Sequence, residues 1–444
     1  MGNKLLDERL VAVPAGRLAR LGYITTVTAS VAGSMAVGGM SQLVKRQRPV
    51  IKDLLLTPQN IFRITEQLAK MRGAAMKIGQ LVSMDAGILL SPELAQIMAR
   101  LRDNAYAMPP VQLKKVLNTQ FQNSWLASFK KFDVHPIAAA SIGQVHRAQL
   151  KDGRDLAIKV QYPGVTASID SDVANVGVLI KMSGLLPKEF RLETYLEEGR
   201  QQLHKETDYV QEASNLKKFK ELLKDAPQFV VPAVHAEWST SNVLAMDFMA
   251  GIAIEDLDSE TQDVRDNLII SLVELLLREL FDFGLMQTDP NFANYQYKPD
   301  TKQIVLLDFG AVTQIDPDLI EKYKRLVFSG LSNDMGGLLN AISSIGFIDA
   351  STSIEHRGRI IRMVCSVFEA ILKDGTINFK NLELAEQLQA EGLALLEDGF
   401  LPPVLPIDVL LIQRKFAGIF LLATRLAAQV DIRKILWKET KMFP

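Results

Sequence analysis

Residues 287–310 of this chain are QTDPNFANYQYKPDTKQIVLLDFG, and this stretch decides the fold. It contains Asp289, then Asn294 in the same loop, and then Asp308 in an Asp-Phe-Gly triplet. The apolar run Ile304–Leu307 comes directly before Asp308 and predicts a buried strand that ends in a carboxylate. A lone Asp-Phe-Gly says little, but an Asp-x-x-x-x-Asn loop followed by such a strand is a much rarer combination.

Protein kinases use this spacing for phosphoryl transfer. A catalytic aspartate precedes a metal-binding asparagine in one loop, and the aspartate of Asp-Phe-Gly holds Mg²⁺. The stretch therefore predicts that Asp289 is catalytic and that Asn294 and Asp308 bind Mg²⁺ beside ATP. A second Asp-Phe-Gly at 282–284 follows a run of helical character rather than a strand. We expect it to end a buried helix, with Gly284 as the stop.

The composition of the 444 residues is that of a globular protein with a sizeable core. The length is enough for two or three domains or for one two-lobed enzyme. The net charge of −1 gives no global electrostatic case for binding nucleic acid. The single cysteine, Cys365, cannot form an internal disulfide, which fits a reducing compartment. The histidines are scattered without the spacing of metal ligands.

An uncharged stretch near the start raises the question of membrane contact. Leu21–Val44 has basic flanks and is long enough to span a bilayer, but it is poor in Leu, Ile and Phe, so its insertion energy is weak. The first interpretation is a helix packed on the protein or lying at a surface; the alternative is a membrane-embedded or dimerising helix. Small residues would permit the close helix contact of a homodimer: Gly33, Ser34, Gly38 and Gly39. Met1–Arg9 is charged, and we expect no cleavable secretory signal.

The order of predicted elements indicates an α+β fold with two kinase-like lobes and a helical N-terminal extension. The expected parts are an N-terminal segment 1–50, a helical extension 51–135, a small lobe 136–250 and a helical large lobe 251–444. The small lobe opens with a hairpin, Gln144–Leu150 and Asp155–Val160, around a Lys-Asp-Gly-Arg turn. A helical region follows from Val165 to about Leu223.

Lys159 lies on the second strand of that hairpin. A kinase-like enzyme needs a cation there to hold the α- and β-phosphates of ATP. Such a lysine needs a carboxylate partner on the following helix, and the candidates are Glu206, Asp208 and Glu212. Helical geometry separates Glu206 and Glu212 by about 120° around the axis. The two glutamates should therefore not perform the same job.

The loop before this hairpin departs from the protein-kinase pattern. A protein kinase carries a Gly-rich loop over the phosphates, whereas residues 138–143 are Ala-Ala-Ala-Ser-Ile-Gly. The Cβ of alanine restricts both the approach of backbone to phosphate and positive φ angles. Taken alone, this segment would be an ordinary small-residue turn.

Residues 246–249, Met-Asp-Phe-Met, fall where the hinge between two kinase lobes is expected. Their backbone would recognise adenine, with Met246 near the gatekeeper position, which makes Met246 and Phe248 candidate nucleotide contacts. The alternative is an ordinary strand.

Together these motifs resemble the UbiB (AarF-domain) family of atypical protein-kinase-like proteins. The Ala-rich loop, Lys159 and the two aspartates occur with Lys77-Ile78-Gly79-Gln80 on a predicted helix, and the resemblance runs from about Arg48 to Phe443. Thr-Asp-Pro-Asn at 288–291 resembles the coenzyme Q kinase-like branch, whereas many bacterial members carry Asp-Pro-His-Pro-Gly-Asn. This departure leaves the two functional positions of the loop intact, so it bears on subfamily rather than chemistry.

The resemblance assigns roles to residues outside the catalytic loop. Lys77, Gly79 and Gln80 match the Lys-x-Gly-Gln motif, whose helical extension packs over the active site in the family. Glu206 and Asp208 match the Glu-x-Asp motif that contacts it. A lysine and a glutamine from an outside helix would occupy the space where a peptide substrate normally docks.

The resemblance also implies ATP or ADP and Mg²⁺ as cofactors. It leaves Glu212 as the expected ion-pair partner of Lys159. It makes the Ala-rich loop the nucleotide loop, formed by Ala138, Ala139, Ala140 and Ser141.

The segment after Asp308-Phe309-Gly310 offers no platform for a peptide substrate. Asp316 as N-cap and Pro317 at the first position predict that a helix starts there. No long activation segment and no Ala-Pro-Glu precede it. Phosphorylation of protein Ser, Thr or Tyr in trans is therefore disfavoured.

The resemblance implies an Mg²⁺-dependent atypical kinase or ATPase that supports biosynthesis of ubiquinone or another isoprenoid quinone. The alternatives are a small-molecule or lipid kinase and a nucleotide-gated lipid-binding scaffold without phosphoryl transfer. Expected partners are an isoprenoid lipid or quinone precursor, a membrane surface and quinone-biosynthesis proteins. We expect a bacterial cytoplasmic protein that touches the inner membrane, with a mitochondrial location as the alternative. The apolar stretch Val409–Ala428 contains Arg414 and Lys415 and is expected to be a core helix.

Overall fold

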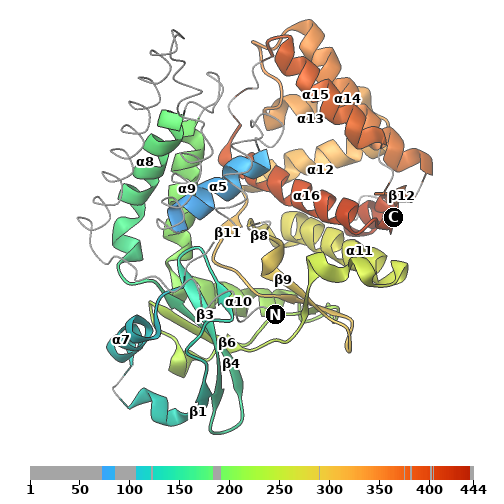
Figure 1. Cartoon of the computed structure of the whole chain (residues 1–444). Helices are drawn as coiled ribbons and strands as arrows, with labels where there is room; N and C mark the ends of the chain where they lie inside the picture. The colour runs from blue at the N-terminus through green and yellow to red at the C-terminus, as the bar shows by residue number, and fades with distance from the viewer. Residues whose placement is uncertain are drawn as a thin grey trace, which may run out of the picture. The chain divides into compact units, whose positions relative to one another are not determined.

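The computed structural model describes residues 73–85, 107–121, 124–183, 192–289, 291–374, 376–380, 383–400, 403 and 405–440. The predicted segment 1–50 with Leu21–Val44, and most of the extension 51–135, lie outside the described residues. The chain forms two compact units (Figure 1). The first comprises Met1–Lys217 and Pro232–Met249, and the second comprises Lys218–Val231 and Ala250–Pro444.

The first unit is built on a five-stranded antiparallel sheet, with strand order β1-β3-β4-β6 and β2 paired to β3. The strands are β1 (Phe129–Phe132), β2 (Ala138–Ala139), β3 (Gly143–Leu150), β4 (Asp155–Gln161) and β6 (Val243–Asp247). The predicted hairpin is β3 and β4, and Gly153 turns it with φ of 98°, a conformation that favours glycine. Six of the seven β4 residues are buried, because β3 and β6 flank the strand.

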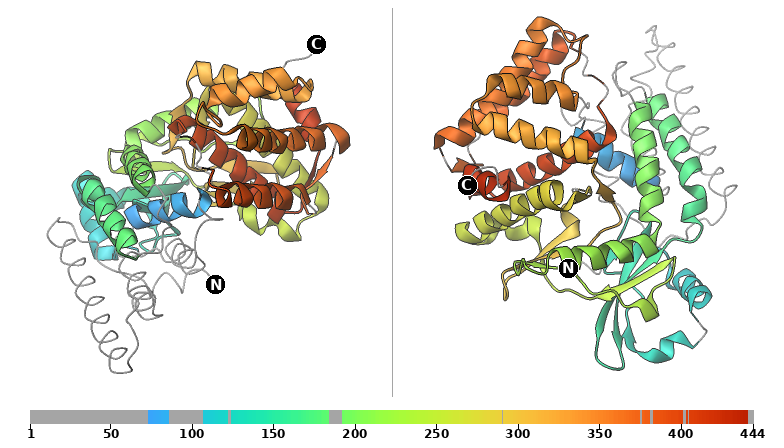
Figure 2. Two further views of the ribbon diagram at one scale, coloured as in Figure 1. Left: turned by 90° about the horizontal axis from the view of Figure 1, so that it is seen from above. Right: turned by 180° about the vertical axis from the view of Figure 1, so that it is seen from behind.

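Three helices of the first unit pack against one another (Figures 1 and 2). The described helices of this unit are α5 (Gly73–Asp85), α7 (Pro110–Gln120), α8 (Val165–Ser183), α9 (Leu192–Glu206) and the start of α10 (Tyr209–Leu222). Helices α5, α8 and α9 pack against one another. Gly199 on α9 makes room for α5, since a Cβ there would lie 2.3 Å from Ile78 Cδ1. Short 3₁₀ turns are η1 (Trp125–Ser128) and η2 (Ala236–Trp238).

The helical region predicted from Val165 to about Leu223 is interrupted between Glu206 and Tyr209. The side chain of Asp208 accepts a hydrogen bond from the Gln211 backbone N–H at 2.9 Å and so caps the start of α10. Glu206 therefore ends one helix and Glu212 belongs to the next. The expected 120° separation around a single axis was wrong, because it assumed a continuous helix.

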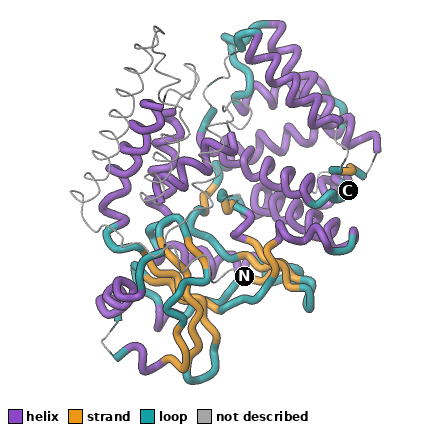
Figure 3. Tube along the Cα trace, in the orientation of Figure 1, coloured by secondary structure: helices purple, strands orange, loops and turns teal. Residues whose placement is uncertain are grey.

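The second unit contains small sheets within a helical body (Figure 3). The four-stranded sheet has the order β5-β10-β9-β7, with β5 parallel to β10 and the other pairs antiparallel. Its strands are β5 (Phe229–Val230), β7 (Ile252–Ala253), β9 (Tyr295–Lys298) and β10 (Gln303–Leu306). Two shorter antiparallel pairs are β8 (Leu285–Gln287) with β11 (Val312–Gln314), and β12 (Ile377–Asn378) with β13 (Gln429–Val430). The predicted hairpin before Asp308 is β9 and β10.

The helical body of the second unit starts with α11 (Gln262–Arg278), which continues into one π-helical turn, η4 (Glu279–Phe283). Gly284 ends this turn with φ of 57°, as predicted from the Asp-Phe-Gly triplet at 282–284. The later helices are α12 (Pro317–Leu331), α13 (Met335–Ile345), α14 (Ile354–Asp374), α15 (Glu383–Glu397), α16 (Ile407–Arg425) and α17 (Ile432–Thr440). Further 3₁₀ turns are η3 (Ile254–Ser259) and η5 (Phe292–Asn294).

Helices α12 and α16 test two of the predicted elements. Asp316 caps α12 by accepting the backbone N–H of Asp318 at 2.8 Å, and Pro317 occupies the first helical position. One face of α16 packs in the core, and Arg414 and Lys415 lie buried on it. None of the helices in the described part of the chain is long and apolar enough to cross a membrane.

Candidate nucleotide and metal site

In the first unit, strand β4 carries Lys159 between its partners Val145 on β3 and Leu244 on β6. The ammonium donates to both carboxylate oxygens of Glu212, at 2.8 and 3.1 Å. The side chains are 8% and 0% exposed, respectively. Removing one partner of such a buried pair leaves an uncompensated charge, so the two side chains hold each other in place.

The other glutamate, Glu206, belongs to a separate cluster in the same unit. Its Oε1 lies 2.7 Å from Nζ of Lys77, which is buried on α5. Its Oε2 accepts a hydrogen bond from the hydroxyl of Ser141 in the Ala-rich loop. Glu206 thus joins the Lys-x-Gly-Gln helix to the loop expected to hold nucleotide. Gly79 is buried on the same helix.

Glycine at position 73 brings α5 close to the Ala-rich loop. A Cβ on Gly73 would lie 2.6 Å from the backbone oxygen of Ser141, a distance that real Cβ atoms do not tolerate. The loop itself pairs with β3 through Ala138 and Ala139, and the N–H of Ala140 donates to the Gly143 carbonyl at 2.8 Å. The loop is therefore a tight turn held on both sides.

The expected hinge residues lie at the end of β6. Met246 is buried and pairs with Ala157 on β4. The N–H of Phe248 donates to the Asp155 carbonyl at 2.9 Å, so an adenine contact by the Phe248 backbone would have to use its carbonyl oxygen. The side chain of Asp247 accepts the Ala233 N–H at 2.9 Å, which ties the end of β6 to the chain before it.

In the second unit, strand β8 leads directly into the loop that contains Asp289. The backbone N–H and hydroxyl of Thr288 both donate to the Ala311 carbonyl, at 2.8 and 2.7 Å. The carbonyl of Asp289 accepts hydrogen bonds from the side-chain amides of Gln287, at 2.9 Å, and Asn294, at 3.3 Å. Because Asn294 donates through Nδ2, its Oδ1 is the atom left to meet a metal.

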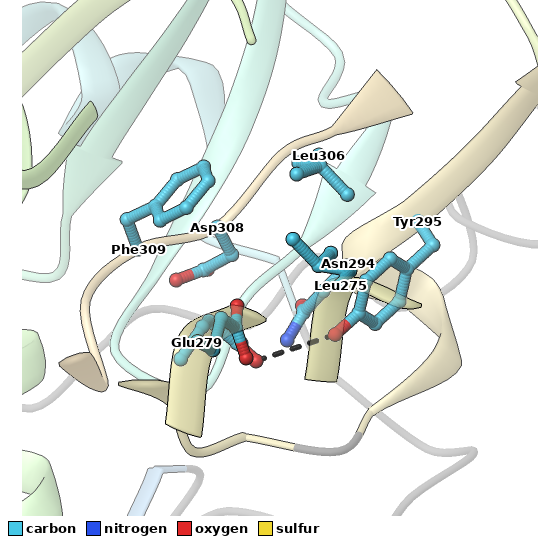
Figure 4. A pocket seen from close by; sticks show the side chains of 8 residues that line it. Leu275, Glu279, Asn294, Tyr295, Leu306, Asp308 and Phe309 are labelled. Atoms are coloured by element: carbon cyan, nitrogen blue, oxygen red, sulfur yellow. Dashed lines mark hydrogen bonds between the residues drawn. The ribbon is translucent and has the colours of Figure 1, made fainter. Parts of the chain in front are cut away.

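Asn294 and Asp308 line the same pocket, together with Glu279, Gln287 and hydrophobic neighbours (Figure 4). The Gly310 N–H donates to Asp308 Oδ1 at 2.9 Å and fixes that carboxylate. Phe309 is buried against Phe219, with ring centroids 4.6 Å apart, and anchors the triplet. The structure therefore brings Asn294 and Asp308 together.

An amide oxygen and a carboxylate are suitable donors for Mg²⁺, which prefers oxygen ligands. Mg²⁺ usually takes few protein ligands and fills its remaining positions with water and substrate phosphates. Asn294 and Asp308 line one pocket, so their oxygen atoms are a donor set that suits Mg²⁺.

The sequence interpretation missed a buried charged residue under this loop. Lys415 on α16 is 3% exposed, and its Nζ lies 2.9 Å from Oε2 of the buried Glu279. It also donates to the Gln287 carbonyl at 2.7 Å. Burial is the largest influence on the pKa of Lys415 and lowers it, but Glu279 and Tyr295 together outweigh burial, so the net direction of the pKa is upward. Burial also raises the pKa of Glu279. The available signal was a lysine within an apolar helix.

The structure does not place Asp208 in the cluster of Lys77, Glu206 and Ser141. Asp208 is exposed and caps α10, whereas Glu206, the glutamate of the Glu-x-Asp motif, pairs with Lys77. Gln80 lies on α5, and its side chain is outside the described part of the chain.

Comparison with known proteins gives consistent findings. The model of the ABC1 atypical kinase-like domain matches residues 100–342. The mitochondrial atypical kinase COQ8 of Saccharomyces cerevisiae is 38% identical over 430 residues, which cover 96% of this chain and 85% of that protein. The probable protein kinase UbiB of Pseudomonas fluorescens is 27% identical over 308 residues, covering 67% and 58%.

A solved structure has a similar fold. It is the complex of Rv3197 with erythromycin from Mycobacterium tuberculosis, with a TM-score of 0.59 and 24% sequence identity. The similarity covers 84% of this chain and 93% of that one. The predicted kinase-like α+β class is confirmed.

Proposed function

Because this chain belongs to the ABC1 atypical kinase-like family, we propose that it binds ATP with Mg²⁺ and transfers or hydrolyses the terminal phosphate in support of ubiquinone biosynthesis. The observation that carries this proposal is the buried pair of Lys159 and Glu212 in a chain that also holds Asn294 and Asp308 around one pocket. A solvated lysine with a surface role would have no need of a fully buried counter-charge.

The residues divide the work as follows. Lys159 holds the α- and β-phosphates, and Glu212 keeps its ammonium oriented. Asn294 and Asp308 would hold Mg²⁺, which neutralises phosphate charge when bound. Asp289 orients the attacking water or hydroxyl. Such positioning and charge stabilisation account for most of the rate in phosphoryl transfer.

The geometry after Gly310 supports an acceptor other than a peptide. Strand β11 pairs with β8 within a few residues of Gly310, and α12 starts at Pro317. No stretch remains between them for an extended activation segment. We propose that the acceptor is water or a small molecule, with an isoprenoid quinone precursor as the expected lipid partner.

Location and partners are part of the same proposal. Contact with a bacterial inner membrane and with quinone-biosynthesis proteins is the first expectation. A mitochondrial location is the alternative, and the name of the yeast relative favours it. Binding of the purified chain to liposomes of bacterial and mitochondrial lipid composition would test the membrane part directly.

Phosphate release by the purified chain tests the proposed activity. We expect release that requires Mg²⁺ and stops with EDTA. Asp289→Asn should lose turnover yet still bind nucleotide, because Asp289 acts on the attacking group. A wild-type chain that binds no nucleotide would refute the proposal.

The same assay separates the two alternatives. Addition of a prenyl-phenol that becomes phosphorylated would establish the small-molecule or lipid kinase. Complementation of a quinone-deficient strain by Asp289→Ala would instead favour the nucleotide-gated scaffold. Stimulated phosphate release without a phosphorylated phenol would support the ATPase.

A further inference from the structure

We propose that Lys415 is a positioning residue for the catalytic loop, acting on Asp289 through Gln287. The inference rests on the proposed phosphoryl-transfer function and deepens it. Lys415 lies on α16, beyond residues 100–342 that the family model matches, so this contribution comes from outside the recognised domain.

Lys415 contacts both the backbone and the side chain of Gln287. The ammonium donates to the Gln287 backbone carbonyl at 2.7 Å and to its side-chain Oε1 at 3.2 Å. The same Nζ lies 2.9 Å from Oε2 of Glu279, so the carboxylate supplies a counter-charge to the cation. One cation therefore fixes both the backbone and the side chain of the residue that ends β8.

Hydrogen bonds hold the side-chain amide of Gln287 in one orientation. Its Oε1 accepts from Lys415 and from the Tyr295 hydroxyl, the latter at 3.3 Å. With the oxygen held by two donors, the NH₂ group must face the other way. It donates to the Asp289 carbonyl at 2.9 Å.

The Asp289 carbonyl that Gln287 contacts is also bound by Asn294. The Asp289 carbonyl also receives the Asn294 amide at 3.3 Å, so one oxygen ties the catalytic aspartate to a metal-binding residue. If Gln287 turned, the Asp289 carbonyl would lose one of these two hydrogen bonds. Misplacement of a catalytic group by about 1 Å can lower a rate about 100-fold.

Stability is a weak explanation for this arrangement. Glu279 and Lys415 are 1% and 3% exposed, and taking two charges out of water is costly. Well-packed apolar side chains of similar size often serve a fold as well or better. The π-helical turn that begins at Glu279 is a further sign, since such turns are frequent at functional sites.

The test compares Lys415→Met with the double variant Lys415→Met/Glu279→Leu. The single variant leaves the Glu279 carboxylate buried without its cation and should melt at a lower temperature. The double variant should recover the melting temperature. Its kcat for ATP turnover should stay about 100-fold below wild type, as in the single variant, because both variants lack the ammonium that orients Gln287. KM for ATP should change little, since Lys159 remains. A double variant with wild-type kcat would overturn the proposal.

Two further variants complete the design. Gln287→Met keeps the ion pair and removes the amide link, so it should lower kcat with little change in melting temperature; a wild-type kcat here would also overturn the inference. Lys224→Met, which removes an exposed pair with Glu221, is the control and should keep wild-type kcat. A wild-type chain without any nucleotide binding would refute the proposed function instead, which keeps the two failures distinct.

Discussion

Replacing Glu212 by glutamine tests the ion pair that would orient the phosphate-binding lysine. The substitution keeps the shape of the side chain but removes its charge. The Glu212 side chain is 0% exposed and that of Lys159 8%, so the lysine ammonium would be left buried without its counter-charge. Breaking a buried pair in this way costs about 3–5 kcal/mol. Because the glutamine side chain still offers one hydrogen-bond acceptor, we expect the free energy of unfolding to fall by about 3 kcal/mol.

The assay is thermal unfolding followed by fluorescence. For a unit of this size, about 3 kcal/mol lowers the melting temperature by roughly 6–12 °C. Glu237→Gln is the matched control, because Glu237 pairs with Arg154 at 50% and 45% side-chain exposure. Exposed pairs contribute about 0–1 kcal/mol, so the control should melt close to the wild-type temperature. Equal melting temperatures for Glu212→Gln and the wild type would refute the reasoning.

Three other predictions concern the same fold. Burial lowers the pKa of His146 from 6.5 to about 4, so the unfolded chain binds its proton more tightly. The contribution of His146 to stability should be present above about pH 6.5 and lost as pH falls towards 4, by about 3 kcal/mol in total. Denaturant titrations at several pH values should show this loss. The variant His146→Met should lack that share of the pH dependence. Gly73→Ala should destabilise the first unit by about 1–3 kcal/mol because its Cβ meets the Ser141 carbonyl, whereas Gly392→Ala on α15 meets nothing and should be neutral or slightly stabilising. Gly284→Ala should cost about 1 kcal/mol, since φ of 57° disfavours a side chain, and an unchanged unfolding midpoint would contradict this.

Local pattern was enough to predict much of this protein. Strands β3 and β4 and the hairpin of β9 and β10 follow from apolar runs bounded by turn residues, so their positions could be predicted without a structure. The family resemblance rested on motifs with fixed spacing. The α12 start followed from the Asp-Pro pair.

The break between α9 and α10 could have been predicted as well. Asp208 is a good N-cap residue, and it lies just before α10. The break was not recognised because the sequence on both sides of Asp208 has a helical pattern. Once the break is recognised, Glu206 and Glu212 are free to take different partners, which is the arrangement seen.

Other features depend on contacts that no local pattern contains. Lys415 and Gln287 are 128 residues apart in the chain, and Ser141 and Glu206 are 65 apart. A charged residue in an apolar helix is visible in the sequence, but its partner is fixed only when the second unit folds. Likewise, a π-helical turn at Glu279 has no sequence signature of the kind that marks a helix cap.

The most direct test of the central claim compares the two Asp-Phe-Gly triplets of this chain. Calorimetric titration with ADP and Mg²⁺ should show that Asp308→Asn loses Mg²⁺-dependent nucleotide binding. Asp282→Asn is the matched control, because Asp282 is exposed at the end of the π-helical turn. It should bind as the wild type does. Unchanged affinity in Asp308→Asn would contradict the assigned metal site and with it the proposed phosphoryl-transfer chemistry.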